Sequence, residues 1–148
     1  MIFNSMFYSM VQVTKDVVEE FADDNVKYLE LRTTPRDVPA TRMTKSSYIA
    51  SVVAAINAAV SSEKDIIVRL LLALDRRMSL PDIEETLKLA NLYASQSDSI
   101  VVGLDLSGNP LVCVLHRQRK LLCLAGHTVH FLILIENISS ILSLVRIH

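Results

Sequence analysis

The stretch Ile100–Pro110 (IVVGLDLSGNP) decides how this chain can fold. Five apolar or small residues run from Ile100 to Leu104, and an acid, Asp105, precedes a turn cluster of Ser, Gly, Asn and Pro. A short apolar run that ends in turn-forming residues is typical of a buried strand that stops at a tight loop. We therefore predict a strand over 100–106 that is followed by a polar turn.

Two earlier stretches repeat this organisation. Val26–Arg36 (VKYLELRTTPR) and Ile66–Arg77 (IIVRLLLALDRR) are apolar runs that end in charged, threonine or proline residues. They predict strands over 26–31 and 66–74. Near-continuous apolar strands are typical of a parallel sheet that is covered on both faces, so we expect the three strands to share one parallel sheet.

The segments before and between the predicted strands have helical periodicity. The first helix is predicted over 14–24, with Asn25 as a left-handed stop. Its apolar stripe is predicted as Val13, Val17 and Phe21, with Val18 and Ala22 beside it. The second is predicted to follow an N-cap at Thr44, and the third to open at 79–81. Their predicted buried stripes are Tyr48, Val52, Ile56 and Val60, and Ile83, Leu87, Ala90 and Ala94. Strand starts about 40 and 34 residues apart suit right-handed β-α-β crossovers.

The composition fits one globular domain in a reducing, intracellular compartment. The chain has 148 residues, of which 51% are hydrophobic and 21% charged, so a core can form. Its 15 basic and 16 acidic residues leave a net charge of -1, which does not favour nucleic acid or an anionic membrane as a partner. Two cysteines, and an apolar N-terminus without a basic leader, predict a cytoplasmic protein.

One late apolar segment, Leu121–Ile135, is a candidate for a membrane span. His127 and His130 interrupt it, and Glu136 follows. A spanning helix needs ~20 nearly uninterrupted apolar residues. We therefore predict that this segment does not cross a membrane.

Polar clusters follow each of the three predicted strands. They are Thr33-Thr34-Pro35-Arg36, Asp75-Arg76-Arg77, and Asp105 with Ser107-Gly108-Asn109. The carboxyl ends of parallel strands meet at one edge of a sheet, where ligands bind. Loops at strand ends are polar in any α/β protein, so one cluster alone says little. Three together predict a ligand-binding edge.

Three motifs carry a resemblance to a known family. KYLELRTTPR, ALDRR and VVGLDLSGNP, in this order and at this spacing, resemble the adenosine deaminase family, and most closely its adenosine deaminase-like branch, which removes methylamine from N6-methyl-AMP. The helix, strand and loop of VTKDVVEEFADDNVKYLELRTTPR are the most specific part, and the resemblance covers residues 11–110. It implies a partial (β/α)8 barrel of the metal-dependent hydrolase type.

The implied domain organisation follows from where the resemblance ends. Residues 1–110 would hold about three β-α units of the barrel, and residues 111–148 would form a divergent, irregular apolar segment. The resemblance also implies a zinc-activated water and a purine nucleotide as the small-molecule substrate. Open sheet edges in such a partial barrel would favour self-association.

Six positions match the family's substrate contacts, and they are Thr33, Thr34, Pro35, Arg36, Asp75 and Gly108. The loop over 33–36 would hold ribose or phosphate oxygens, and a guanidinium such as that of Arg36 suits a phosphate. Asp75 would accept hydrogen bonds from hydroxyls. Gly108 would bring its backbone N–H to the purine ring, because no side chain blocks close approach. The structural alternatives are a loop charge, a strand-end cap and a turn.

The family's zinc ligands and catalytic acid have no match here. The family's early HxH motif is missing, because the first histidine is His116, and the later HxxE-type motif is replaced by HTVH over 127–130. The family's late aspartate ligand would lie beyond residue 148. We therefore expect no catalytic residue and no zinc ligand in this chain. The remaining candidates lack a usual zinc spacing: Cys113, Cys123, His127 and His130.

Three interpretations of function remain open at this point. The first is the family's hydrolytic deamination of N6-methyl-AMP or a related adenine nucleotide in purine metabolism, with this chain inactive alone. The second is a non-catalytic α/β module that binds a nucleotide or a protein partner. The third is an alternatively spliced product with no function of its own.

Overall fold

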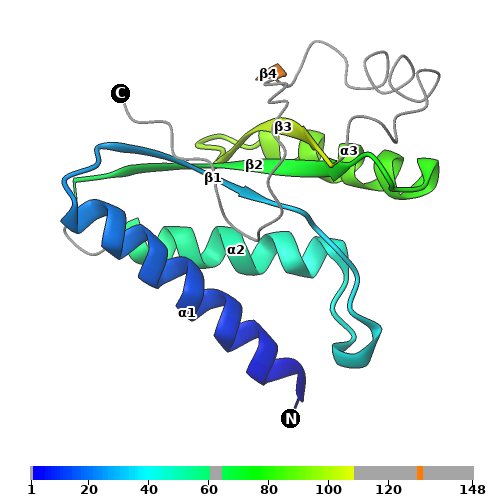
Figure 1. Cartoon of the computed structure of the whole chain (residues 1–148), viewed down its shortest axis with the longest axis horizontal. Coiled ribbons are helices and arrows are strands. Elements are labelled where there is room, and N and C mark those ends of the chain that lie inside the picture. Colours follow the sequence, from blue (N-terminus) through cyan, green and yellow to red (C-terminus); the bar gives the residue numbers. More distant parts are fainter. Residues whose placement is uncertain (1, 61–64, 109–129, 132–148) are drawn as a thin grey trace. The chain divides into compact units, whose positions relative to one another are not determined.

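The computed structural model describes residues 2–60, 65–108 and 130–131, in which strands alternate with helices (Figure 1). The elements are α1 (Ile2–Asp23), β1 (Tyr28–Thr33), the 3-10 helix η1 (Pro39–Thr41), α2 (Lys45–Val60), β2 (Ile67–Asp75), α3 (Leu80–Ala94), β3 (Val101–Ser107) and β4 (His130–Phe131). The strands are hydrogen-bonded in the order β1-β2-β3-β4, and β3 runs parallel to both of its neighbours. The predicted α/β class with a parallel sheet is confirmed.

The described residues divide into two compact units. The first unit contains residues 2–31, 35–60 and 65–69, and therefore holds α1, η1 and α2. The second contains residues 32–34, 70–108 and 130–131, and therefore holds α3, β3, β4 and the carboxyl-terminal parts of β1 and β2. The predicted boundary at 110/111 lies outside the described residues and stays a prediction.

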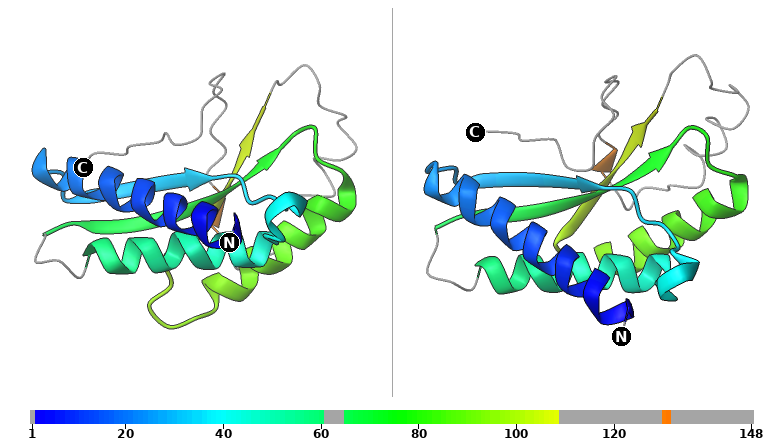
Figure 2. Two further views of the ribbon diagram at one scale, coloured as in Figure 1. Left: turned by 90° about the horizontal axis from the view of Figure 1, so that it is seen from below. Right: turned by 60° about the horizontal axis from the view of Figure 1, so that its bottom comes forward.

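In the first unit, α1 and α2 lie side by side (Figures 1 and 2). The buried face of α1 is centred one position from the predicted stripe: Val18, predicted beside the stripe, is buried together with Thr14, whereas Val13 is 47% exposed. One position along a helix rotates the direction of the side chain by ~100°. The predicted start near residue 14 is also wrong, because the helix begins at Ile2. Its end is confirmed by Asn25, which has a φ of 63°.

Local hydrogen bonds explain where α2 begins. The Ser47 N–H donates to Thr44 Oγ1 over 3.2 Å, which confirms the predicted N-cap. The predicted residues Tyr48, Val52 and Ile56 are buried, as is Ile49. Val60, the last residue of the predicted stripe, is only half-buried because the helix ends there.

In the second unit, β2 and β3 reach the same level at their carboxyl ends. Asp75 lies opposite Ser107, and Ala73 lies opposite Asp105. Every residue of β2 from Leu70 to Leu74 is buried, as expected for a strand that is covered on both faces. Each strand ends one or two residues later than predicted, because the polar residues Thr33, Asp75 and Ser107 continue the strands.

The helix α3 connects these two strands and packs on β3. Ser79 is its N-cap, as predicted, and its side chain accepts a hydrogen bond from the Asp82 N–H. Three residues of the predicted stripe are buried, namely Ile83, Leu87 and Ala90, whereas Ala94 is half-buried at the end of the helix. A proline in its first turn is tolerated because the N–H groups of that turn have no partner within the helix.

Several predictions fall outside the described residues. They concern Asn109, Pro110, Cys113, Cys123 and most of Leu121–Ile135, from which only β4 is described. Within the described residues, no helix is both long enough and apolar enough to cross a membrane.

Candidate functional site

The candidate site is the polar edge where β1, β2 and β3 end within the second unit. We call it the strand-end site, and define it by Arg32, Thr33, Thr34, Asp75, Arg76, Arg77, Asp105, Ser107 and Gly108. All nine residues belong to the same compact unit. The parallel register brings charged and small residues from separate parts of the chain to one edge, which is where parallel sheets bind ligands.

A buried ion pair joins the end of β1 to β3. Arg32 Nη1 lies 2.9 Å from Asp105 Oδ2, and the two side chains are only 11% and 0% exposed. Arg32 immediately precedes Thr33 and Thr34, so the pair anchors the start of the loop that was predicted to bind substrate. Removing one member of a buried pair leaves the other charge without compensation.

Opposing effects act on the pKa of the Asp105 carboxyl group. Burial raises its pKa above the usual 3.8, while the charges of Arg32 and Arg76 and the Leu106 N–H act in the opposite direction. Its second oxygen, Oδ1, and the Arg76 Nε are both buried and have no hydrogen-bond partner among the described residues. The carboxyl group therefore tolerates protonation better than an aspartate in water does.

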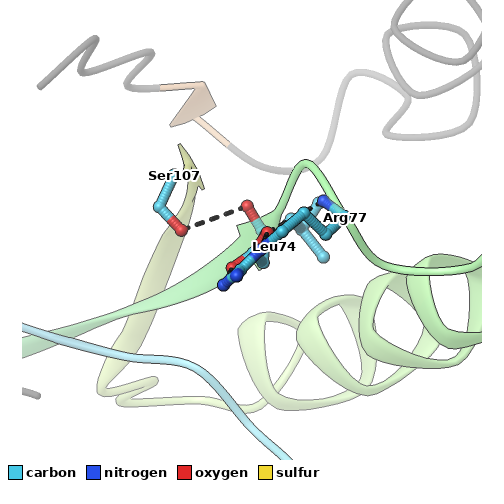
Figure 3. Close-up of polar contacts among 4 residues, drawn as sticks. Leu74, Arg77 and Ser107 are labelled. Atoms are coloured by element: carbon cyan, nitrogen blue, oxygen red, sulfur yellow. Dashed lines mark hydrogen bonds and ion pairs between the residues drawn. The ribbon is translucent and has the colours of Figure 1, made fainter. Parts of the chain in front are cut away.

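Hydrogen bonds also hold the ends of β2 and β3 together. The Arg76 N–H donates to the Ser107 carbonyl over 3.0 Å. The Ser107 hydroxyl donates to the Leu74 carbonyl over 3.3 Å, and Figure 3 shows this contact with Arg77 close by. The residues on either side of Asp75 are therefore both tied to the end of β3.

The Asp75 carboxylate is oriented by Arg77. Asp75 Oδ1 accepts from the Arg77 backbone N–H (2.8 Å) and from Nε (3.0 Å), and Oδ2 accepts from Nη2 (2.7 Å). These hydrogen bonds lower the pKa of Asp75 below 3.8, although partial burial opposes them. Asp75 is therefore a fixed, ionised acceptor.

Gly108 lies directly against this carboxylate. Its φ is +95°, and a Cβ at this position would lie 3.0 Å from Asp75 Oδ1 and 3.3 Å from the Arg76 nitrogen. Any side chain here would strain the backbone and crowd Asp75. The glycine therefore lets β3 end in close contact with the Asp75 carboxylate without crowding it.

Four of the six predicted site residues lie together in the second unit. Thr33 is buried at the end of β1, Thr34 is half-buried, and Asp75 and Gly108 are adjacent. The other two, Pro35 and Arg36, follow in the sequence and belong to the first unit; Pro35 is buried and Arg36 is exposed. The substrate contacts assigned to these six residues stay predictions.

The partnership of Arg32 with Asp105 and that of Asp75 with Arg77 were not predicted from the sequence. The first had a signal, because Asp105 is charged yet lies within a predicted apolar strand, and Arg32 directly follows another. The second had a signal in the close spacing of an aspartate and an arginine at a strand end. Neither signal identifies the partner.

The described residues do not fit the zinc ion that the resemblance implies. Among them, no three histidine, cysteine, aspartate or glutamate side chains gather into a group that could hold a metal ion. Both carboxylates of the strand-end site are instead bound by guanidinium groups.

The fold and the site together define an α/β protein whose parallel strands end at a charged, ligand-binding edge. A comparison with protein families identifies it further. Residues 7–121 match the family described as adenosine deaminase, and the chain belongs to this family.

Several similar proteins are named as deaminases of a methylated nucleotide. The chain is 50% identical over 103 residues to the N6-methyl-AMP deaminase of Homo sapiens, which covers 70% of this chain and 29% of that protein. It is 52% identical over 100 residues to N6-methyl-AMP deaminase-L of Xenopus laevis, with 68% and 28% covered. The chain thus spans less than a third of the length of these relatives.

Solved structures give the same result. The chain superimposes on the Arabidopsis N6-mAMP deaminase with a TM-score of 0.72 and 40% identity, covering 80% of this chain and 36% of that one. For Arabidopsis ADAL complexed with GMP the TM-score is 0.74 at 38% identity, with 86% and 38% covered. The chain therefore has part of an adenosine deaminase-type barrel, and the predicted resemblance is confirmed.

Replacing Asp105 tests the buried ion pair. We expect Asp105→Ala to lower the free energy of unfolding by about 3 kcal/mol, because it leaves the Arg32 guanidinium buried without a carboxylate. Asp105→Asn should cost less, since an amide oxygen can still accept from Arg32 Nη1. Urea denaturation measures both, and Asp24→Ala, at an exposed aspartate, is the control. An Asp105→Ala effect under about 0.5 kcal/mol, the range of ordinary surface substitutions, would contradict the account.

The two aspartates of the strand-end site should have pKa values on opposite sides of 3.8, the usual value for an aspartate. NMR titration of the carboxyl carbons should give Asp75 a lower pKa and Asp105 a higher one. Asp75 then contributes stability above pH 3.8 that is lost as pH falls through its folded pKa. The contribution of Asp105 is complete below pH 3.8 and is lost as pH rises through its folded pKa. The reverse order of the two pKa values would refute this electrostatic description.

Proposed function

We propose that the chain carries the nucleotide-binding edge of an adenine nucleotide deaminase of the kind that acts on N6-methyl-AMP. We further propose that this polypeptide alone binds a purine nucleotide without deaminating it. The observation that carries the proposal is the close approach of Gly108 to Asp75. A Cβ on Gly108 would lie only 3.0 Å from Asp75 Oδ1, so glycine is the residue that leaves this carboxylate uncrowded.

The hydrogen-bonding capacity of Asp75 supports a hydroxyl-bearing ligand. An ionised carboxylate has about four acceptor positions, and three N–H groups of Arg77 occupy part of this capacity. The second position on Oδ2 suits a hydroxyl donor such as a ribose. Thr33 and Thr34 add hydroxyl groups at the neighbouring strand end.

The relatives support a purine mononucleotide as the ligand class. Arabidopsis ADAL has been crystallised in complex with GMP and with IMP, which are both purine monophosphates. In this chain, Arg36 follows Thr34 in the same loop and is exposed, so its guanidinium is accessible to a phosphate. The composition, with two cysteines in 148 residues, supports a cytoplasmic location for this reaction.

Binding without turnover is supported by the donor set of the chain. Base deamination in enzymes of this chemistry uses a zinc-bound water and a general acid or base. Here no histidine precedes His116, and the described residues offer no group of three metal ligands. The two aspartates of the strand-end site are each paired with an arginine.

Gly108→Ala tests the proposed nucleotide site. We expect at least a tenfold loss of AMP affinity in isothermal titration calorimetry, because the added Cβ would crowd Asp75 Oδ1. The matched control is Asn25→Ala, which also places alanine at a positive φ but lies in the turn after α1. This control should keep AMP affinity within twofold. No detectable AMP binding by the unmodified chain, or equal affinity in Gly108→Ala, would refute the site.

The absence of turnover is tested separately. The purified chain, incubated with N6-methyl-AMP with and without added Zn²⁺, should release no methylamine above a control without protein. A lack of methylamine release is informative only if the AMP titration shows that the chain binds a nucleotide. Methylamine release that depends on the chain would overturn the proposed lack of activity.

A further inference from the structure

We propose that Arg77 is a specificity-determining residue, which binds the phosphate of a nucleotide and so lets the strand-end site distinguish nucleotides from nucleosides. The inference rests on the proposed function, and it adds a residue outside the six predicted contacts. It follows from the way Arg77 is held, from its exposure and from the charge of the site.

The guanidinium of Arg77 is fixed in orientation but remains accessible. Its Nε and Nη2 bind the two oxygens of Asp75 over 3.0 and 2.7 Å, which is the bidentate geometry that favours a single orientation. A guanidinium has five N–H groups, so most of its donors are left over. The side chain is 74% exposed, and the leftover donors can therefore meet an incoming anion.

The anchor of Arg77 is the group that we propose as the hydroxyl acceptor. Asp75 Oδ2 lies 2.7 Å from Arg77 Nη2, and Gly108 lies against Asp75 Oδ1 without a side chain to crowd it. A nucleotide whose ribose contacts Asp75 thus lies next to a guanidinium already in place. Preorganised donors lose little side-chain entropy on binding.

The charges of the strand-end site also favour an anion. Arg32, Arg76 and Arg77 outnumber Asp75 and Asp105, and each aspartate is paired with an arginine. Pairing with Arg77 offsets the repulsion that the Asp75 carboxylate would exert on a phosphate. The surplus charge belongs to Arg76, but its Nε is buried, so Arg77 presents the more accessible donors.

The alternative is that Arg77 only closes the turn after β2. In that case its loss would disturb Asp75 and weaken every ligand of the site to the same extent. A phosphate-binding role predicts instead that the phosphorylated ligand loses more affinity than the nucleoside. The ratio of nucleotide to nucleoside affinity therefore separates the two.

The test is a calorimetric titration of AMP and adenosine into the whole chain and into three variants. We expect Arg77→Gln to lower AMP affinity at least tenfold more than it lowers adenosine affinity, because only AMP carries a phosphate. Arg77→Lys, which keeps the charge but not the bidentate fork, should lose a smaller factor of at least threefold for AMP. Arg42→Gln, at an exposed arginine that ends η1, should change neither affinity.

Each outcome decides the matter. Equal losses for both ligands, or an unchanged AMP affinity, would overturn the role of Arg77 while leaving the nucleotide site intact. If the unmodified chain binds neither ligand, the proposed function fails and this inference fails with it. If circular dichroism shows that Arg77→Gln does not fold, Arg77→Lys decides: a threefold fall in the AMP-to-adenosine affinity ratio supports the proposal, and an unchanged ratio overturns it.

Discussion

The buried ion pair between Arg32 and Asp105 is the interaction on which the strand-end site depends. It joins residues 73 positions apart, and it lies where water scarcely reaches either side chain. Moving two charges out of water is costly, so the pair stabilises the fold only while the two side chains remain in contact. That requirement fixes where β1 ends relative to β3 within the second unit. Because Thr33 and Thr34 directly follow Arg32, the ion pair also fixes their position at this edge.

A second constraint comes from the alignment of β2 with β3. Asp75 lies opposite Ser107, so the residues that follow the two strands, Arg76 and Gly108, lie close together. Gly108 also lies against the Asp75 carboxylate. Arg77 folds back onto the same carboxylate from the turn that leads toward α3. Charged side chains and a closely packed glycine therefore meet at one edge. This is the combination of features that a small, hydroxylated, anionic ligand requires.

Much of this fold could be predicted from the sequence, but only where a local signal existed. The apolar runs of β2 and β3 placed those strands to within one residue, and Thr44 and Ser79 placed two helix starts. The start of α1 had no capping signal, and the burial of the polar Thr14 was not predicted. The pairing of Arg32 with Asp105 could not be predicted, because partners distant in sequence become neighbours only through the sheet register. The six proposed substrate contacts came from family resemblance, and physical chemistry alone would have given only a polar edge.

The central claim is that a purine nucleotide binds at the strand-end site. The most direct measurement is a backbone amide NMR spectrum of the isotope-labelled chain, recorded during a titration with AMP. The account predicts that the largest shift changes fall on the amides of Thr33, Thr34, Arg77 and Gly108. No saturable changes, or changes confined to α1 and α2, would contradict it.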